Sequence, residues 1–484
     1  MKSQSPDSGD GIPGKIAYPG GTEYSQTQEP APQRHGSLPH RRPMLSLECL
    51  NGLTSRQGTE ENKSRFWGND PSTLLRPAET CLADFIVGTA LDIYTSTILP
   101  ALESAQQEIL FVTCFWARSA SLQKLCSTLV NLSHRHFQST GTSKLRVRLC
   151  FSSRSLTQKL FHTSSANGYT YPQSKWRSLG LPAPEDLEGL DLQVKSLFVL
   201  PFSVMHPKFI VIDRQRVLLP SCNLSWESWL ECCLPLTGPI VNLFVQFWHD
   251  TWGRDDRSDL PATLLPYQGS SIMTTHTTVF LPSPHHRNPR FQLLPFTSFA
   301  PAPPTPLNSM ILHLFSKAQQ SIVLLTPNLT SPPVISSLLE ALSRGVNVTV
   351  ITNRRMMIVE QLITSGTITE VCVWKLRSRY SIMSHRKLPR DHVGDVETGI
   401  NARNVGLLRI GYYRPTVEYK RTHIKCSTID DRVIVLGSGN MDRASWYTSQ
   451  ELGISIEGEE VVKEIWKAIE GSFEEEIWQG IHWL

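Results

Sequence analysis

The sequence lacks long apolar runs and a strong charge of either sign. No stretch of about 18 or more apolar residues occurs, so we expect no transmembrane helix. The opening residues, MKSQSPDSGDG, lack the apolar stretch of a signal peptide. We therefore expect an intracellular protein, either cytoplasmic or peripherally membrane-associated. The net charge of +4 is small for 484 residues and does not indicate a dedicated nucleic-acid binder.

The sequence also lacks the residue spacings of metal sites. Its ten cysteines include no C-x-x-C pair, and no carboxylate cluster accompanies them. Cys114, Cys150, Cys372 and Cys426 fall in apolar, strand-like runs, which predicts buried, reduced thiols and favours a reducing compartment. We expect no metal ion and no cofactor.

Length and composition predict two domains after a tail. A chain of 484 residues exceeds one compact core, and 40% hydrophobic residues can fill two. Residues 1–77 are rich in Ser, Pro, Gly, Gln and charge, which predicts disorder. We expect domains at 78–260 and 309–484, joined by a Pro-rich linker with one strand at 261–308.

Hydrophobic spacing predicts an α/β fold in the first domain. The pattern favours a helix over 82–104, interrupted near Pro100, and a buried strand over 108–116. A helix over 119–135 and a strand over 145–153 follow. A strand, a helix and a second strand in this order indicate a parallel βαβ unit.

The second domain repeats the first. Residues 311–329 match residues 98–116, including a shared Ala-Gln-Gln. The closing helix expected at 459–478 corresponds to the helix expected at 240–252, and VCVWKL (371–376) is predicted as a strand. Matched positions keep an almost constant separation, which indicates an internal duplication.

Both halves contain the same polar motif. It reads H-x-K, four residues, Asp, seven residues, Ser-x-Asn, and then a carboxylate that opens an apolar run. The first copy holds His206, Lys208, Asp213, Ser221, Asn223 and Glu231, and the second holds His423, Lys425, Asp430, Ser438, Asn440 and Glu451.

This motif suits phosphoryl transfer when two copies face each other. Alternate residues of a strand share a face, so each copy presents one imidazole and one ammonium. The lysines, with Asn223 and Asn440, would hold the phosphate oxygens. One imidazole would attack phosphorus and the other would serve as acid and base. Glu231 and Glu451 are candidates to fix the tautomer of the attacking histidine.

The double H-x-K-x4-D-x6-G-S-x-N pattern resembles the phospholipase D superfamily in its two-motif, single-chain form. The resemblance covers most of 80–484, and the second half looks like the cardiolipin synthase and bacterial-type phospholipase D branch. It implies an α/β sandwich duplicated about one shared active site, in a monomer with an internal pseudo-dimer. It also implies His206 as the nucleophile, His423 as the general acid/base, and structural roles for Asp213 and Asp430. Ser221 and Ser438 are expected to bind phosphate or support the site.

One position departs from the pattern. Pro220 stands where the motif has Gly, and Pro reaches neither positive φ nor close backbone approach as Gly does. We expect altered loop geometry around Ser221 and Asn223. Trp226 and Trp446 follow the two asparagines closely and are candidates for the wall of the cleft.

The sequence favours a metal-independent phosphodiesterase or phosphatidyltransferase that acts on phospholipid through phosphohistidine, with peripheral membrane contact. One alternative is a nuclease or tyrosyl-DNA-phosphodiesterase-like enzyme on nucleic acid. Another is a non-catalytic lipid- or nucleic-acid-binding protein. A basic cluster is either a solvated mobile loop or a surface for anionic headgroups or nucleic acid. It comprises Lys375, Arg377, Arg379, Arg386, Lys387 and Arg390.

Overall fold

The computed structural model describes most of the chain from residue 44 onward. The described ranges are 44–55, 74–140, 144–200, 203–256, 275–285, 301–385, 405–414, 418–471 and 482–483. All of them belong to one unit, Pro43–Leu484. Within this described part, no helix is long and apolar enough to cross a membrane.

The disorder predicted for residues 1–77 is wrong for one segment. Most of the other residues of this range lie outside the described part of the chain. Leu45–Ser55 form helix α1, which packs against α7 (Pro306–Lys317). Cys49 and Leu50 are buried in the core of the second half. The polar composition of the surrounding sequence concealed this short apolar stretch.

The first half contains a six-stranded arrangement with helices packed on it. Strands β3 (Glu108–Phe115), β4 (Leu145–Ser153) and β6 (Leu190–Ser196) are parallel, and β9 (Phe209–Ile212), β10 (Arg216–Pro220) and β11 (Trp229–Thr237) continue antiparallel. The helices are α2 (Ala90–Ile93), η3 (Tyr94–Ile98), α3 (Leu99–Glu103), α4 (Ala120–Thr140), α5 (Leu156–Leu160), η4 (Gln173–Leu179), η5 (Pro184–Leu187) and α6 (Ile240–Thr251). The short strands are β2 (Ile86–Gly88), β5 (Tyr169–Thr170), β7 (Phe198–Val199) and β8 (Ser203–Val204).

The second half repeats this order. Strands β13 (Ser321–Leu325), β14 (Asn347–Thr352) and β15 (Leu408–Tyr412) are parallel, and β17 (Cys426–Ile429), β18 (Val433–Gly437) and β19 (Glu451–Glu457) are antiparallel. The helices are α7, α8 (Pro332–Ser343), α9 (Ile358–Ser365), α10 (Thr369–His385), α11 (Arg443–Tyr447) and α12 (Glu459–Gly471). The short strands are β16 (Arg421–Thr422) and β20 (His482–Trp483).

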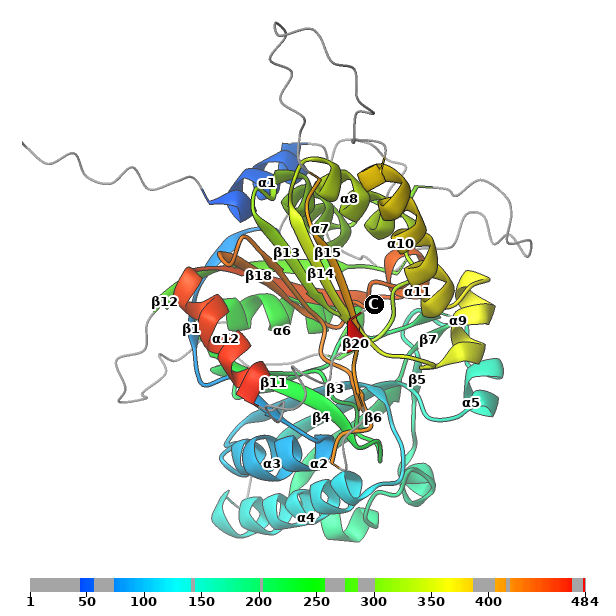
Figure 1. Ribbon diagram of the computed structural model, residues 1–484. Coiled ribbons are helices and arrows are strands. Elements are labelled where there is room, and N and C mark those ends of the chain that lie inside the picture. Colours follow the sequence, from blue (N-terminus) through cyan, green and yellow to red (C-terminus); the bar gives the residue numbers. More distant parts are fainter. Residues whose placement is uncertain are drawn as a thin grey trace, which may run out of the picture. The chain divides into compact units, whose positions relative to one another are not determined.

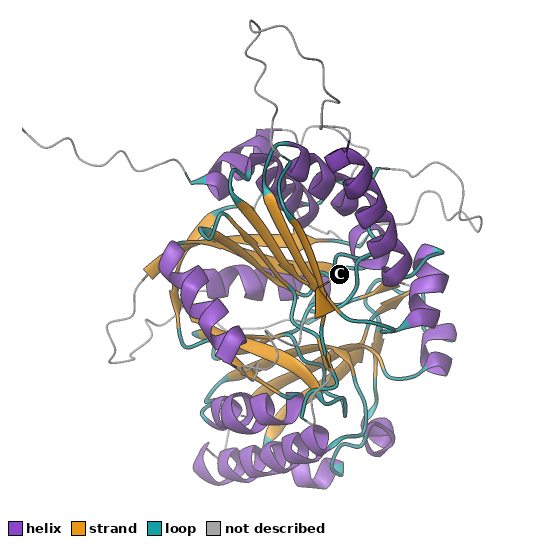
Figure 2. Cartoon of the chain, viewed as in Figure 1, coloured by secondary structure: helices purple, strands orange, loops and turns teal. Residues whose placement is uncertain are grey.

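Two further strands join the halves into one continuous sheet (Figures 1 and 2). Strand β1 (Pro77–Leu82) pairs with β11 and with β12 (Thr275–Ser283), and β12 pairs with β19. The strand expected within the linker is therefore the seam of the sheet. The predicted α/β fold with a repeated plan is confirmed.

Both halves contribute to a shared hydrophobic core. One cluster belongs mainly to the first half and another to the second. A third contains Phe247 and Trp248 of α6 together with Val462 and Ile465 of α12. Because the last helix of each half is buried in this cluster, apolar burial holds the two motifs together.

Two predicted elements differ from the structure, one in its bounds and one in its type. The helix expected over 82–104 begins only at Ala90, because the preceding residues pair with β11, and it continues through Pro100 after the π-helical η3. The segment VCVWKL lies in α10, where buried Val373 and Leu376 follow helical spacing. The third parallel strand is instead β15.

The basic cluster is only partly described. Lys375, Arg377 and Arg379 lie on α10, so the loop interpretation is wrong for them. The other three positions of the cluster lie outside the described residues.

Candidate active site

Backbone hydrogen bonds between the halves set the positions of the two motif histidines. His206 N donates to Gln450 O at 3.0 Å, and His423 N donates to Leu230 O at 2.8 Å. Each acceptor immediately precedes the glutamate of the opposite copy. Each histidine is thus placed beside the carboxylate of the other half.

The histidines and glutamates pair crosswise. His206 Nδ1 lies 2.9 Å from Glu451 Oε2, and His423 Nδ1 lies 2.9 Å from Glu231 Oε1. A carboxylate only accepts hydrogen bonds, so each Nδ1 carries the proton and Nε2 holds the reactive lone pair. The sequence identified both glutamates as candidates, but which histidine each one holds became clear only in the structure.

The motif serines support these glutamates. Ser221 Oγ donates to Glu231 Oε2, and Ser438 Oγ donates to Glu451 Oε2, both at 2.5 Å. Each hydroxyl also accepts a backbone N–H from the strand that carries its glutamate. Of the two roles expected for the serines, the geometry matches support of the site.

Two buried lysines accompany the histidines. Lys208 Nζ donates to His206 O at 3.0 Å, and Lys425 Nζ donates to His423 O at 2.6 Å. Each ammonium retains further donors for an anionic ligand. Among the described residues, no cluster of three or more His, Cys, Asp or Glu side chains is placed to hold a metal ion.

The pKa shifts describe neutral histidines held by charged glutamates. Burial lowers the pKa of His423 to about 3, against the attraction of Glu231, and burial likewise lowers the pKa of His206. Burial raises the pKa of each glutamate, but the paired histidine and the hydrogen bond from the motif serine contribute to a larger opposing effect, so the net pKa falls. Both imidazoles are therefore unprotonated at Nε2 before an anion binds.

Lys425 shows that the two halves share one electrostatic site. Burial, followed by the charge of Lys208, lowers the pKa of Lys425 to about 7. Lys425 also contributes to the lowered pKa of His206, and Lys208 to that of His423. A phosphodiester anion between the lysines would relieve this repulsion.

The asparagines are anchored differently. Phe115 N donates to Asn223 Oδ1 at 3.2 Å, which directs that amide through its oxygen and keeps its N–H₂ as the donor. Asn440 Nδ2 donates to Asp442 Oδ2 at 3.0 Å, and its Oδ1 is buried without a hydrogen bond. The two halves are therefore not identical at these amides.

The motif aspartates cap the neighbouring strands. Asp213 accepts the backbone N–H groups of Gln106, Gln107 and Glu108. Asp430 accepts those at 319–321 in the same way. The repeated Ala-Gln-Gln thus supplies backbone donors to each aspartate, and these contacts match the structural role that the resemblance implies.

Pro220 does not disturb the site as expected. Ser221 N donates to Cys232 O at 2.8 Å, and the equivalent Ser438 N donates to Leu452 O at 2.9 Å. Pairing of β9 with β10 ends at Leu218, so the ring nitrogen of Pro220 interrupts no ladder bond there. The expectation of altered geometry is therefore wrong at Ser221, whereas the anchoring of Asn223 does differ from that of Asn440.

The tryptophans near the motif occupy different environments. Trp446 is buried in the second-half core, which contradicts a place on the cleft wall, whereas Trp226 is 63% exposed. The ring centroid of Trp229 lies 4.9 Å from that of His423, a contact that the sequence did not single out. The position of Trp229 two residues before Glu231 was the available signal.

A group of arginines that the sequence did not single out lies beside the second motif. Arg354, Arg355, Arg414 and Arg421 line one cavity, together with Arg377 from the expected basic cluster. They come from four separate segments. Only Arg421, two residues before His423, stood within the motif segment.

One family model matches the second half of the chain. Residues 311–473 match the family model described as "Cardiolipin synthase, PLD-like domain". No sequence among curated proteins is significantly similar to the chain.

One solved structure shares the fold over most of its length. The crystal structure of phosphatidylserine synthase from Haemophilus influenzae Rd KW20 matches with a TM-score of 0.52 at 14% identity, covering 82% of this chain and 88% of that one. Nuc, a phospholipase D family member from Salmonella typhimurium, matches with a TM-score of 0.24 at 14% identity, covering 34% of this chain and 83% of that one. The second half of the chain is therefore similar to the PLD-like domain of cardiolipin synthases, and the likeness to phosphatidylserine synthase shows the fold.

Proposed function

We propose that the protein is a phospholipase D-type phosphodiesterase or phosphatidyltransferase that acts on phospholipids without a metal ion. The crosswise pairing of His206 with Glu451 and of His423 with Glu231, beside two buried lysines, carries the proposal. The similarity to a cardiolipin synthase domain and to a phosphatidylserine synthase supports the lipid substrate.

In the first step, His206 Nε2 attacks phosphorus. The new P–N bond forms as the P–O bond to the headgroup alcohol breaks, and His423 gives the departing oxygen a proton. That proton must reach His423 on substrate binding, when the phosphate charge offsets the lysines that lower its pKa. Lys208 and Lys425 stabilise the charge on the phosphoryl oxygens.

In the second step, water or an alcohol attacks the phosphohistidine. His423 takes the proton of the attacking oxygen, the P–N bond breaks, and His206 leaves with its lone pair restored. Glu451 holds the same His206 tautomer throughout the cycle, because its carboxylate accepts from Nδ1 and leaves Nε2 for phosphorus. Water yields hydrolysis, whereas an alcohol yields transfer.

The proposal includes peripheral contact with an anionic membrane. Helix α9 exposes Val359, Leu362 and Ile363 by 70%, 51% and 49%. Arg354 and Arg355, which lie just before it, would face lipid phosphates as these side chains enter the interface. Figure 1 shows α9 on the outer side of the second half.

Vesicle sedimentation tests this contact. Val359→Glu and Leu362→Glu should release the protein from phosphatidylglycerol vesicles, whereas Leu407→Glu, also at an exposed position, should not. Equal binding by all variants would contradict membrane contact through α9.

The decisive assay supplies the purified protein with a phospholipid panel, with and without a primary alcohol and a chelator, beside single-stranded DNA. We expect phosphatidic acid in water, phosphatidyl-alcohol when alcohol is present, and no effect of the chelator. Cleavage of DNA alone, or full activity in His206→Ala, would overturn the proposal.

A further inference from the structure

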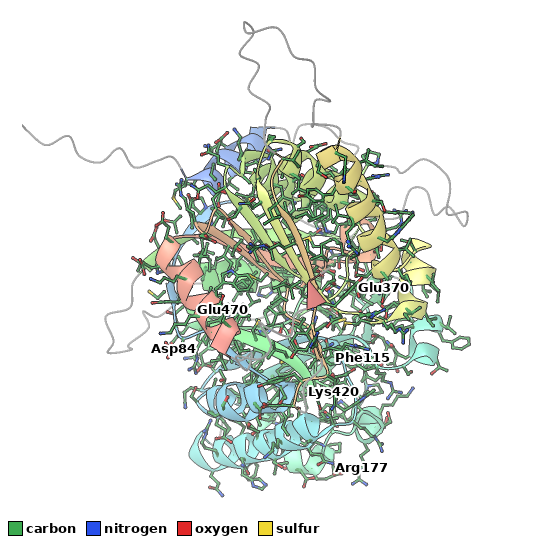
Figure 3. All side chains as sticks on the ribbon, in the orientation of Figure 1. Asp84, Phe115, Arg177, Glu370, Lys420 and Glu470 are labelled. Carbon is green, nitrogen blue, oxygen red and sulfur yellow. The ribbon has the colours of Figure 1, made fainter. Side chains whose placement is uncertain are left out.

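A positively charged cavity lies beside the second motif. Its volume is about 600 Å³, and its lining includes Arg354, Arg355, Arg377, Arg414, Arg421 and Glu370. Five guanidinium groups against one carboxylate make this cavity strongly electropositive. Figure 3 labels Glu370, which lies near the start of α10.

No carboxylate in the described part of the chain neutralises these positive charges through an ion pair. Among the described residues, none of the five arginines forms an ion pair with a carboxylate. Glu370 Oε1 instead accepts the backbone N–H of Arg355, and its Oε2 is buried without a hydrogen bond. A cavity with this excess of fixed guanidinium charge is suited to an anion.

The cavity is held rigidly against the active site. Arg421 precedes His423 by two residues, so roughly 7 Å of strand separates their Cα atoms. Between them, Thr422 N donates to Asn353 Oδ1 at 3.0 Å, and Asn353 Nδ2 donates to Thr422 O at 2.8 Å. Asn353 directly precedes Arg354, so these two bonds fix the cavity wall to the strand that presents the histidine.

Aromatic side chains complete the lining. The guanidinium of Arg354 lies 5.9 Å from the ring centroid of Tyr412. Burial and then Glu370 raise the pKa of Tyr412, against the opposing charges of Arg354 and Arg377. Trp374 is 65% exposed at the same cavity. The apolar faces can contact glycerol and acyl carbons while the arginines hold a phosphate.

We propose that this cavity binds a second phosphate, distinct from the one attacked at His206. This inference rests on the proposed function. The second phosphate belongs either to a donor lipid with two phosphodiesters or to an acceptor alcohol that itself carries a phosphodiester. In both cases a short glycerol bridge would link it to the reacting group, which makes the cavity a specificity site.

The test compares two double variants with equal loss of charge. Arg354→Gln/Arg377→Gln removes two exposed arginines of the cavity, and Lys375→Gln/Arg379→Gln removes two exposed charges of α10 that do not line it. Short-chain lipids in solution separate substrate recognition from membrane binding. Cardiolipin represents the two-phosphate donor, phosphatidylglycerol the phosphorylated acceptor, and phosphatidylcholine with ethanol the reaction without a second phosphodiester.

We expect the cavity variant to raise KM about tenfold or more for cardiolipin as donor or for phosphatidylglycerol as acceptor. An effect on cardiolipin alone identifies the donor as the source, and an effect on phosphatidylglycerol alone identifies the acceptor. Reaction of phosphatidylcholine with ethanol should stay within about twofold of wild type. Equal losses on all substrates, or the same losses in the α10 control, would overturn the inference.

Equilibrium binding keeps this test separate from the proposed function. If the wild-type protein turns over no phospholipid, the proposed function fails, and calorimetry with short-chain cardiolipin still measures the cavity. Binding weakened about tenfold by the cavity variant alone supports a lipid phosphate site. The inference is overturned if the variant binds cardiolipin as tightly as wild type. It is also overturned if the variant weakens binding of single-stranded DNA alone.

Discussion

At the residue scale, the central feature is a pair of Ser–Glu–His hydrogen-bond chains, each of which runs from one half to the other. Ser438 holds Glu451, which holds His206, and Ser221 holds Glu231, which holds His423. A carboxylate on Nδ1 fixes the tautomer and strengthens the basicity of Nε2.

Replacing Glu451 with Gln should lower kcat by about 10²-fold or more, because the neutral amide no longer stabilises the imidazolium or fixes the tautomer of His206. Glu231→Gln should act similarly through His423. Steady-state kinetics checks this, with exposed Glu460→Gln as the control. Near-normal kcat in both site variants would show that the glutamates do not support the histidines in catalysis.

Lys425 should impose an alkaline limb on the pH profile. Its pKa is about 7, so the ammonium is present below this pH and lost above it. We expect kcat/KM to fall as pH rises through about 7, with the acid limb below pH 6.5 because the pKa of His206 is lowered. Bound phosphate restores the ammonium, so kcat should fall at a higher pH than kcat/KM.

Lys425→Arg provides the matched comparison for this profile. Arginine keeps its charge throughout the range, so the limb near pH 7 should disappear in whatever activity remains. An unchanged limb in this variant would assign the titration to another group.

At the element scale, tight hairpins position the two motifs. Asp213 and Arg214 have φ of 51° and 53°, and Asp430 and Asp431 have φ of 53° and 49°. Positive φ at both central residues is typical of the type I′ turn that suits a twisted hairpin. Each first aspartate then caps the start of the neighbouring strand.

Asp430→Ala should therefore reduce stability more than chemistry. It leaves the N–H groups at 319–321 without their carboxylate, at a cost of roughly 1–3 kcal/mol. Urea unfolding should show the loss, while kcat per folded molecule stays within about twofold. A large fall in kcat with unchanged stability would assign Asp430 a chemical role.

Pro220 and Gly437 should respond differently to substitution. A Cβ at Gly437 would lie 2.3 Å from Leu452 O, so Gly437→Ala should destabilise the protein by roughly 1–3 kcal/mol. Pro220→Gly should leave activity within about twofold, because the contacts of Ser221 already match those of Ser438. A large gain of activity in Pro220→Gly would show that the first copy is impaired.

Much of this fold was predictable from the sequence, because the same pattern occurs in both halves and each half supports the assignment made for the other. The motif residues and the α/β plan followed from spacing alone. The helical state of VCVWKL did not, since a short apolar run fits a strand or a helix and its packing decides. The crosswise pairs and the arginine cavity depend on contacts between distant segments, which a single sequence does not encode locally.

At the scale of the whole described unit, the two halves form one site. β1 and β12 join their sheets, and α6 and α12 share one core cluster. Each half supplies the glutamate that the other half's histidine requires. Neither motif copy contains a complete histidine–carboxylate pair by itself.

The phosphohistidine tests this account most directly. His423→Asn should still react with a phosphodiester whose p-nitrophenol leaving group needs no proton, but it should not activate water for the second step. We predict a burst of about one p-nitrophenol per enzyme and, by mass spectrometry of the quenched protein, a phosphoryl adduct on His206. Steady turnover without an adduct, or an adduct on another residue, would contradict the account.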